Sequence, residues 1–267
     1  MTVDPDHVVL VGAGNMGGAM LRRWTAPRVT VLDPAPSEAV AAHMAERGIA
    51  RAAAPDGVAP ASVLVVAVKP QLMDRVLPTL RPLVNGETVV VSVAAGTTVA
   101  TLGAALGTDA VVRTIPNTPA MVGEGAIAAW AAPGVSDAQR AKVDALLASN
   151  GRVAWLGEEA DIDRATAVSG SGPAYVFHLV EALEEAARGI GLDANAAALL
   201  ARQTIVGAGA LLGDSDEPAG ALRERVTSPG GTTAAALDVL MGDGGLRPLV
   251  SRAVGAAHAQ ARELGEG

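Results

Sequence analysis

The chain has no cysteine and very few aromatic residues, which excludes several kinds of protein at once. Without cysteine there is no disulfide framework, no thiolate metal site and no thiol nucleophile. Only 2% of the 267 residues are aromatic although 50% are hydrophobic, so the apolar mass consists mainly of Ala, Val and Leu. The length suffices for one large domain or two modest ones with sizeable cores.

Basic residues are also scarce, and the formal net charge is -8. This balance does not favour a nucleic acid or an anionic membrane as partner. It leaves an anionic substrate open, because a nest of backbone N–H groups can bind one. No metal site is expected, because the four histidines are far apart and lack ligand-type spacing: His7, His43, His178 and His258.

Long, strongly apolar runs are missing as well. The longest one, Val63–Val68, has the length of a strand, and no segment reaches the length expected of a membrane span. The first seven residues, MTVDPDH, are acidic and lead straight into a strand, which is not the pattern of a signal peptide. These features predict a soluble, cytoplasmic protein.

The first half alternates short valine-rich runs with helical stretches. Valine-rich runs without polar alternation are typical of parallel strands buried on both faces. Strand–helix repetition implies right-handed crossovers and a doubly wound sheet. The expected strands are Val8–Val11, Val29–Leu32, Val63–Val68, Val89–Val93, Ala110–Thr114, Ala126–Ala129 and Val153–Leu156, with helices over Met16–Trp24 and Ser37–Arg47.

After about Glu158 helical periodicity takes over. We therefore predict an α/β chain, with an N-terminal Rossmann-type domain over residues 1–157 and an all-α domain over 158–267. The helix expected from Asp193 to Leu212 is apolar nearly all round, so it must be buried on several sides. A second copy of the chain is the economical partner. Further helices are expected over Pro173–Arg188, from Pro218, from Thr233 and over Arg247–Leu264.

A G-x-G-x-x-G motif follows the first strand and opens the first helix, which is the context that a dinucleotide-binding loop requires. The first glycine permits a tight turn, the second lets the backbone approach a pyrophosphate, and the third lets helix and strand pack closely. The free N–H groups at the start of the helix favour the anion. The predicted cofactor-binding loop is Gly12, Ala13, Gly14, Asn15, Met16 and Gly17.

Asp33 closes the second strand, where a carboxylate can bind the ribose 2′-hydroxyl of NAD. An ordinary Asp-Pro turn explains the residue equally well. Arg47 and Arg51 are the nearest following basic residues, and neither is expected in the turn where a 2′-phosphate would lie. This arrangement predicts that NADH is used at least as well as by similar enzymes.

Two further loops leave the carboxyl ends of the third and fourth strands, at the edge where ligands bind in such sheets. Small residues there leave room for a ring, although both loops could be compact turns. They are interpreted as the floor of a nicotinamide pocket, formed by Ala67, Val68, Lys69 and Pro70 and by Ala94, Ala95 and Gly96 within the run Ser92–Gly96.

Several longer blocks resemble the pyrroline-5-carboxylate reductase family, in the same order and over nearly the whole chain. SPGGTT together with SGSGPAY is highly specific, whereas G-x-G-x-x-G alone is weak. The blocks are AVKP at 67–70, RTIPNTP at 113–119, SGSGPAY at 169–175, TSPGGTT at 227–233 and GGLR at 244–247.

The resemblance implies a Rossmann domain, a helical dimerisation domain and an active site at the dimer interface. It implies reduction of L-1-pyrroline-5-carboxylate, a small cyclic imino acid, to L-proline, the last step of proline biosynthesis, with NADPH or NADH. Many members of the family carry a small or basic residue where this chain has Asp33 and favour NADPH, so the acidic residue puts that preference in question.

The TSPGGTT block stands just before a helix, so its glycines present backbone N–H groups to a substrate carboxylate. In similar sites of the family a hydroxyl like that of Thr233 hydrogen-bonds the ring nitrogen, which makes Thr233 the predicted catalytic residue. Helix capping would explain one of these hydroxyls but not the whole block. The predicted substrate-binding residues are Ser228, Gly230, Gly231, Thr232 and Thr233.

Two other residues in these blocks allow two interpretations each. Asn117 either orients the pocket or forms a turn, and Tyr175 either packs in a core or reaches the site.

Two other functions share some of these sequence features. A β-hydroxyacid dehydrogenase has a similar glycine motif but uses a lysine in its second domain, and this chain has only Lys69 and Lys142. A non-catalytic dinucleotide-sensing module is disfavoured by the intact SPGGTT loop.

Overall fold

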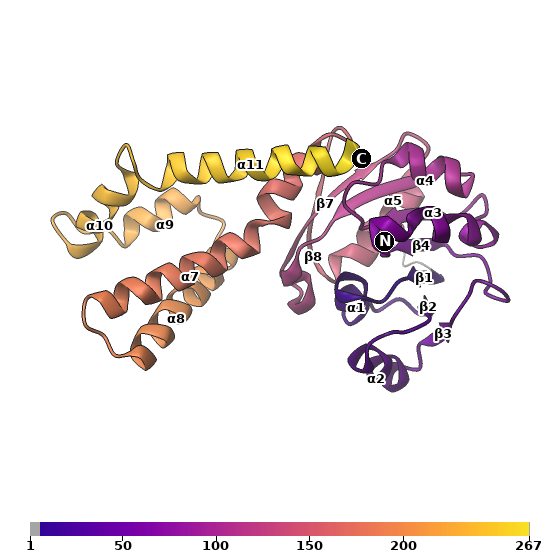
Figure 1. The fold of residues 1–267 in the computed structure, drawn as a ribbon, viewed down its shortest axis with the longest axis horizontal. Helices are drawn as coiled ribbons and strands as arrows, with labels where there is room; N and C mark the ends of the chain where they lie inside the picture. The colour runs from indigo at the N-terminus through magenta and orange to yellow at the C-terminus, as the bar shows by residue number, and fades with distance from the viewer. Residues whose placement is uncertain (1–5, 267) are drawn as a thin grey trace. The chain divides into compact units, whose positions relative to one another are not determined.

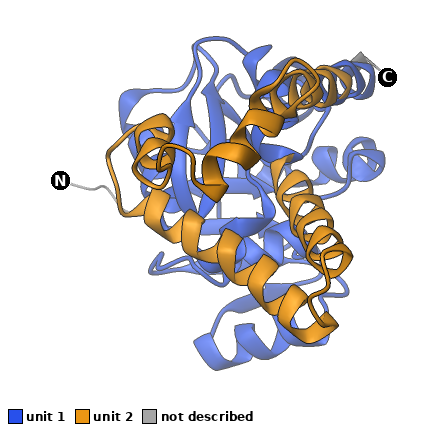
Figure 2. Ribbon diagram, turned by 90° about the vertical axis from the view of Figure 1, so that its left-hand side faces the viewer, with its two compact units in different colours: residues 1–171, 257–267 blue, residues 172–256 orange. Residues whose placement is uncertain are grey.

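The structure is a computed structural model that describes residues 6–266; residues 1–5, which belong to the acidic N-terminal stretch, lie outside the described part. An eight-stranded sheet is followed along the chain by long helices (Figure 1). The chain forms two compact units, coloured separately in Figure 2. Unit 1 comprises residues 1–171 and 257–267, and unit 2 comprises residues 172–256.

The sheet of unit 1 has the strand order β3-β2-β1-β4-β5-β6-β7-β8. Neighbouring strands are parallel except for β6 and β7, which are antiparallel. The strands are β1 (Val8–Val11), β2 (Val29–Leu32), β3 (Ala50–Ala52), β4 (Val63–Val66), β5 (Val89–Ser92), β6 (Val111–Ile115), β7 (Gly125–Ala131) and β8 (Gly151–Trp155).

The direction of winding changes at β1, which pairs with β2 on one side and with β4 on the other. This is the switch point of a doubly wound sheet, where ligands bind beyond the carboxyl ends of the strands. The predicted fold class is confirmed, because the valine-rich runs form the central strands. The edge strand β3 was not predicted, because it has only three residues, mostly exposed, and no apolar run.

Helical segments cover both faces of the sheet. One core lies between the sheet and α1, α2 and α5, and the other lies under α3, η2 and α4. The segments are α1 (Asn15–Leu21), α2 (Glu38–Arg47), η1 (Pro70–Leu72), α3 (Met73–Val76), η2 (Leu77–Leu83), α4 (Val99–Leu106), η3 (Thr118–Val122), α5 (Asp137–Ala148), α6 (Asp161–Ala165) and the π-helical turn η4 (Thr166–Gly170).

Unit 1 extends beyond residue 158, where the sequence pattern changes, to residue 171. The reason is local packing, because Ile162 of α6 lies in a small apolar cluster with Ile115 and Ala128 of the sheet. The boundary between the compact units therefore lies after α6 and η4, whereas the change in periodicity lies before both of them.

Unit 2 contains helices joined by turns and loops, and no strand lies within residues 172–256. Helix α8 is long and apolar enough to cross a membrane by length and composition, which corrects the expectation that no segment reaches that length. Its apolar character is spread over small residues, so no strong continuous run reveals it. The helices are α7 (Gly172–Gly189), α8 (Ala194–Gly213), α9 (Ala219–Arg225), α10 (Thr232–Met241) and α11 (Leu246–Glu266), whose last residues belong to unit 1.

His7, at the amino end of β1, is buried in unit 1. Its Nε2 lies 3.0 Å from the Thr30 hydroxyl and its Nδ1 lies 3.2 Å from the Pro60 carbonyl oxygen. Burial lowers the pKa of His7, against the Pro60 hydrogen bond, which raises it. A protonated imidazole is therefore disfavoured at this position.

We expect His7 to make the fold acid-sensitive. Because its native pKa lies below the ordinary value of about 6.5, the unfolded chain takes up the proton first as the pH falls. The stability is complete above that value and declines as the pH drops toward the native pKa. The urea midpoint should fall less between pH 7.5 and 5.5 in His7→Gln than in the wild type. The exposed His178→Gln variant is the control, and equal pH dependence in all three proteins would contradict the assignment.

Candidate active site

In the glycine-rich loop between β1 and α1, backbone segments approach too closely to leave room for side chains. Gly12 has φ +85°, and a Cβ there would lie 2.9 Å from the Ala67 carbonyl oxygen. A Cβ at Gly17 would overlap the Gly12 carbonyl oxygen, so both positions require glycine. At Gly14 a Cβ would meet no described atom within 4 Å. The loop therefore leaves open space at its second glycine, which fits the approach of a pyrophosphate.

Asp33 joins this loop to the turn that follows β2. Its Oδ2 accepts the Ala13 N–H at 2.7 Å, and its Oδ1 accepts the Ala35 N–H at 2.8 Å. The carboxylate thus forms the turn, as one interpretation predicted, and also holds the glycine-rich loop. One lone pair on each oxygen remains for another donor.

Arg51 also reaches this turn, which corrects the expectation that no arginine lies there. Its Nε donates to the Asp33 carbonyl oxygen at 3.1 Å and its Nη2 to the Pro34 carbonyl oxygen at 2.6 Å. The sequence did not reveal this contact because Arg51 lies on the unpredicted strand β3. Its partner in register is Val31 of β2, so its side chain can extend along the edge to the turn.

The loops after β4 and β5 lie together at the same edge of the sheet. Residues of both line one open cavity of about 680 Å³. Lys69 is exposed at the start of η1, and Ala94 is buried behind the second loop. The cavity is lined by Pro70, Gln71, Met73, Asp74, Ala95, Gly96, Thr97, Thr98, Thr101, Leu264 and Gly265.

The end of α11 is an unpredicted part of this cavity wall. Gly96 has φ +78°, and a Cβ there would lie 2.7 Å from the Leu264 carbonyl oxygen. The backbone of α11 therefore contacts the β5–α4 loop, which comprises residues 93–98. Sequence periodicity predicts the helix but gives no signal for what its last turn contacts.

In unit 2 the SPGGTT block forms the entry to α10. Gly230 has φ +67°, and the Gly231 N–H donates to the Ser228 carbonyl oxygen at 3.0 Å. The N-cap is Gly231, which provides no side-chain hydrogen bond to the helix. The hydroxyls of Thr232 and Thr233 therefore lie within the first turn rather than at the capping position. Capping by a serine or threonine side chain does not explain this block.

The side chain of Asn117 links two segments of unit 1 through hydrogen bonds. Its Nδ2 donates to the Ser169 carbonyl oxygen at 3.0 Å, and its Oδ1 accepts the Ala126 N–H at 2.9 Å. The buried side chain thus ties β7 to the π-helical turn η4.

Tyr175, near the start of α7, is half-buried in the chain. Residues 6–266 contain no cluster of three or more acidic or histidine side chains that could hold a metal ion.

These features define the class of the protein. A Rossmann-type sheet with a glycine-rich loop at its switch point, followed by a helical unit, is the architecture of a dinucleotide-dependent oxidoreductase. Residues 7–96 match the family described as "NADP oxidoreductase coenzyme F420-dependent". Residues 159–264 match the family described as "Pyrroline-5-carboxylate reductase dimerisation".

Relatives that span the whole chain identify the family. The chain is 39% identical to the pyrroline-5-carboxylate reductase of Pseudomonas aeruginosa over 97% of each chain. It resembles the solved structure of that enzyme from Coxiella burnetii with a TM-score of 0.90, at 32% identity over 98% of this chain and 99% of the other. The Plasmodium falciparum structure, with NADP bound, gives a TM-score of 0.79 at 27% identity, covering 97% and 98%.

The chain belongs to the pyrroline-5-carboxylate reductase family and is an NAD(P)H-dependent oxidoreductase. The resemblance on the sequence blocks is confirmed, and so are the predicted enzyme class and the nicotinamide cofactor. Self-association is supported by the match of residues 159–264 to a dimerisation family.

The contact between Gly96 and α11 can be tested with a matched pair of glycines. Gly107 has φ +73°, close to that of Gly96, but a Cβ there would meet no described atom within 4 Å. Gly107→Ala should lower the free energy of unfolding by about 1 kcal/mol through backbone strain alone. Gly96→Ala should cost clearly more and weaken NADPH binding, because the loop or the helix end must move.

Urea unfolding and fluorescence titration with NADPH measure the two effects. If the two alanine variants are indistinguishable in both measurements, α11 does not support the β5–α4 loop.

Proposed function

We propose that this chain reduces L-1-pyrroline-5-carboxylate to L-proline with NADPH or NADH, as the last step of proline biosynthesis in the cytoplasm. The observation that carries the proposal is the entry to α10, where glycine backbone and hydroxyl groups are grouped without serving as a side-chain cap. Relatives of that name along nearly the whole chain support it.

Ser228, Thr232 and the N–H groups at the start of α10 bind the substrate carboxylate. Gly230 and Gly231 leave this backbone uncovered, and the positive end of a ten-residue helix favours an anion. The chain has a net charge of -8, so a local nest of this kind is needed to bind an acidic substrate.

Thr233 orients the ring nitrogen of the substrate through its hydroxyl. When bound, the nicotinamide would supply a hydride for the imine carbon, and the ring nitrogen would take its proton from solvent. The chain therefore contributes position and hydrogen bonding rather than a strong acid or a nucleophile. Thr233 is half-buried in the single chain, which suits a group that contacts both protein and substrate.

The cofactor is held at the switch point of unit 1. The glycine-rich loop Gly12–Gly17 binds the pyrophosphate, with Gly14 facing open space. The loops that contain Lys69 and Pro70 and Ala94–Gly96 form the floor for the nicotinamide, as the shared cavity supports. Ala67 and Val68 form the wall against Gly12.

The functional assembly is a homodimer or a larger oligomer built by the helices of unit 2. In a single chain only Ala197 and Ala201 of α8 are buried. Leu199, Leu200 and Val206 are exposed by half or more, at 65%, 53% and 56%. Helix α8 lies within the segment that matches the dimerisation family, so protein rather than lipid is its proposed neighbour.

Cofactor choice depends on Asp33 and Arg51 together. Asp33 places a negative charge at the turn where the adenosine ribose lies, which disfavours a 2′-phosphate. Arg51 offsets that charge, because its guanidinium lies against the carbonyl groups of the same turn and has N–H groups to spare. We expect both cofactors to be accepted.

The function is tested by turnover of L-1-pyrroline-5-carboxylate with each cofactor, and the six-membered cyclic imine serves as comparison for ring size. Formation of L-proline supports the proposal. Cofactor binding without any turnover would instead support a dinucleotide-sensing module.

For Thr233→Ala we expect kcat/KM to fall about 10-fold or more, because a hydrogen bond to the reacting imine is lost. The Kd of NADPH, measured by fluorescence titration, should change little. Ser251→Ala removes an exposed hydroxyl elsewhere in unit 2 and is the control. Wild-type kcat and KM in the Thr233 variant would remove this residue from the site.

Arg51→Gln should lower the ratio of kcat/KM for NADPH to that for NADH by about 5-fold, because a partly screened positive charge is lost. Arg152→Gln is a matched control, since Arg152 is an exposed arginine on β8, the opposite edge strand. An unchanged ratio in Arg51→Gln would show that this guanidinium only supports the turn.

A further inference from the structure

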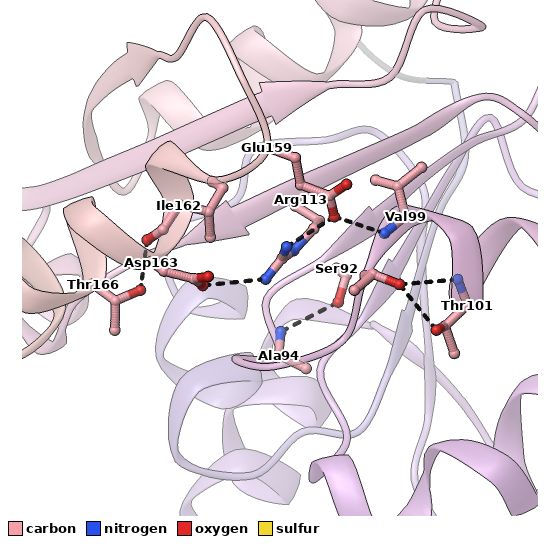
Figure 3. Close-up of polar contacts among 10 residues, drawn as sticks. Ser92, Ala94, Val99, Thr101, Arg113, Glu159, Ile162, Asp163 and Thr166 are labelled. Carbon is pink, nitrogen blue, oxygen red and sulfur yellow. Dashed lines mark hydrogen bonds and ion pairs between the residues drawn. The ribbon is translucent and has the colours of Figure 1, made fainter. Parts of the chain in front are cut away.

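A buried arginine joins three elements of unit 1 behind the β5–α4 loop (Figure 3). Arg113 of β6 is exposed by only 6%, and its Nη1 lies 2.8 Å from Glu159 Oε1. Its Nη2 lies 3.7 Å from Asp163 Oδ1. Its Nε is buried and has no hydrogen-bond partner within residues 6–266. Two carboxylates therefore balance the arginine's charge, and Glu159 lies much closer to it.

Glu159 makes a second contact with the same oxygen. Its Oε1 accepts the N–H of Val99 at 2.9 Å, and Val99 is the first residue of α4. A carboxylate at this position satisfies an N–H group that the helix cannot pair internally and interacts favourably with the helix dipole. One carboxylate oxygen thus ties the start of α4 to a side chain of β6, as Figure 3 shows.

The start of α4 is also the end of the β5–α4 loop. Thr98 caps the helix through the Thr101 N–H at 3.2 Å, and the Ala94 N–H donates to the Ser92 hydroxyl at 3.3 Å. These bonds are local, so they set the shape of the loop but not its place relative to β6. Among the contacts described here, the Glu159 carboxylate is the one that links α4 to Arg113.

We infer that Glu159 is a positioning residue for hydride transfer. It fixes the β5–α4 loop against the sheet through Val99 and Arg113, and so sets where the loop holds the nicotinamide. The inference rests on the proposed function, in which Ala94–Gly96 form the nicotinamide floor. Loss of the carboxylate would release the helix N-terminus and leave the buried arginine with only the distant Asp163.

The adjacent Glu158 provides a control within the same turn. It is 62% exposed and pairs with Arg164, which is itself 56% exposed. An exposed pair of this kind contributes little to stability. Glu158→Ala and Glu159→Ala therefore remove the same group one residue apart, and only the second acts on the β5–α4 loop.

The experiment measures four quantities in Glu159→Ala, Glu159→Gln, Glu158→Ala and the wild type. These are the urea midpoint, the Kd of NADPH, kcat with L-1-pyrroline-5-carboxylate, and the primary isotope effect with cofactor deuterated at the transferred position. Glu159→Ala should lower kcat about 10-fold or more and raise the isotope effect, because misplacement slows hydride transfer. The Kd should change less than about 3-fold, since most cofactor contacts lie elsewhere.

Glu159→Gln should recover part of kcat, because its amide oxygen can still accept the Val99 N–H. Glu158→Ala should match the wild type. If folded Glu159 variants keep the wild-type kcat and isotope effect, the inference is overturned even though the proposed function stands. A change in the urea midpoint alone would likewise overturn it. A wild-type protein that binds NADPH but does not turn over the substrate would refute the proposed function instead.

If Glu159→Ala does not fold, the comparison of Glu159→Gln with Glu158→Gln decides. An isotope effect and kcat equal in these two variants would overturn the inference.

Discussion

The apolar surface of unit 2 is the constraint on which the rest of the structure depends. Helices α7 and α10 bury no residue in the single chain, and α8 buries only two alanines. Exposed large hydrophobic residues occur on α7, α8, α10 and α11, among them Phe177, Leu199, Val239 and Leu249. A concentration of exposed apolar side chains of this kind is typical of an interface. We propose that a second copy covers these helices and completes the surroundings of the SPGGTT block.

In unit 1, the loops at the carboxyl ends of the strands are placed by close backbone contacts that leave no room for a side chain. Gly12 and Gly17 bring β1, α1 and the end of β4 into direct contact, while Gly14 faces open space. Gly96 brings the β5–α4 loop against α11 in the same way. Carboxylates then hydrogen-bond to these loops: Asp33 accepts the Ala13 N–H, and Glu159 accepts the Val99 N–H. Close backbone contacts and carboxylate hydrogen bonds together shape the site that we propose for the cofactor.

Much of unit 1 could be predicted from the sequence because each central strand is a valine-rich run buried on both faces. The helices of unit 2 followed from periodicity and from clear boundaries, such as Asp193, whose carboxylate accepts the Asn195 and Ala196 N–H groups. The edge strand β3 escaped prediction because an exposed strand needs no apolar run. Strand β7 was predicted over Ala126–Ala129, but its antiparallel pairing with β6 was not, because the residue pattern does not encode strand direction.

The site was predictable in its motifs but not in its long-range contacts. Glycine spacing and the SPGGTT block locate the two loops that we propose as binding loops, since both depend on local backbone geometry. Arg51 and Glu159 act on loops far away in sequence, at separations that no local pattern records. The same limit applied to α11, whose last turn contacts Gly96. Asp33 was open between two roles, and the structure shows it forming the turn and also holding the glycine-rich loop.

We propose that the active enzyme requires a second copy to cover unit 2. Sedimentation velocity combined with turnover assays, over a dilution series of the same sample, tests it most directly. We expect a species of at least twice the mass of one chain, and a loss of turnover that follows dissociation on dilution. A stable monomer that keeps full turnover of L-1-pyrroline-5-carboxylate would contradict it.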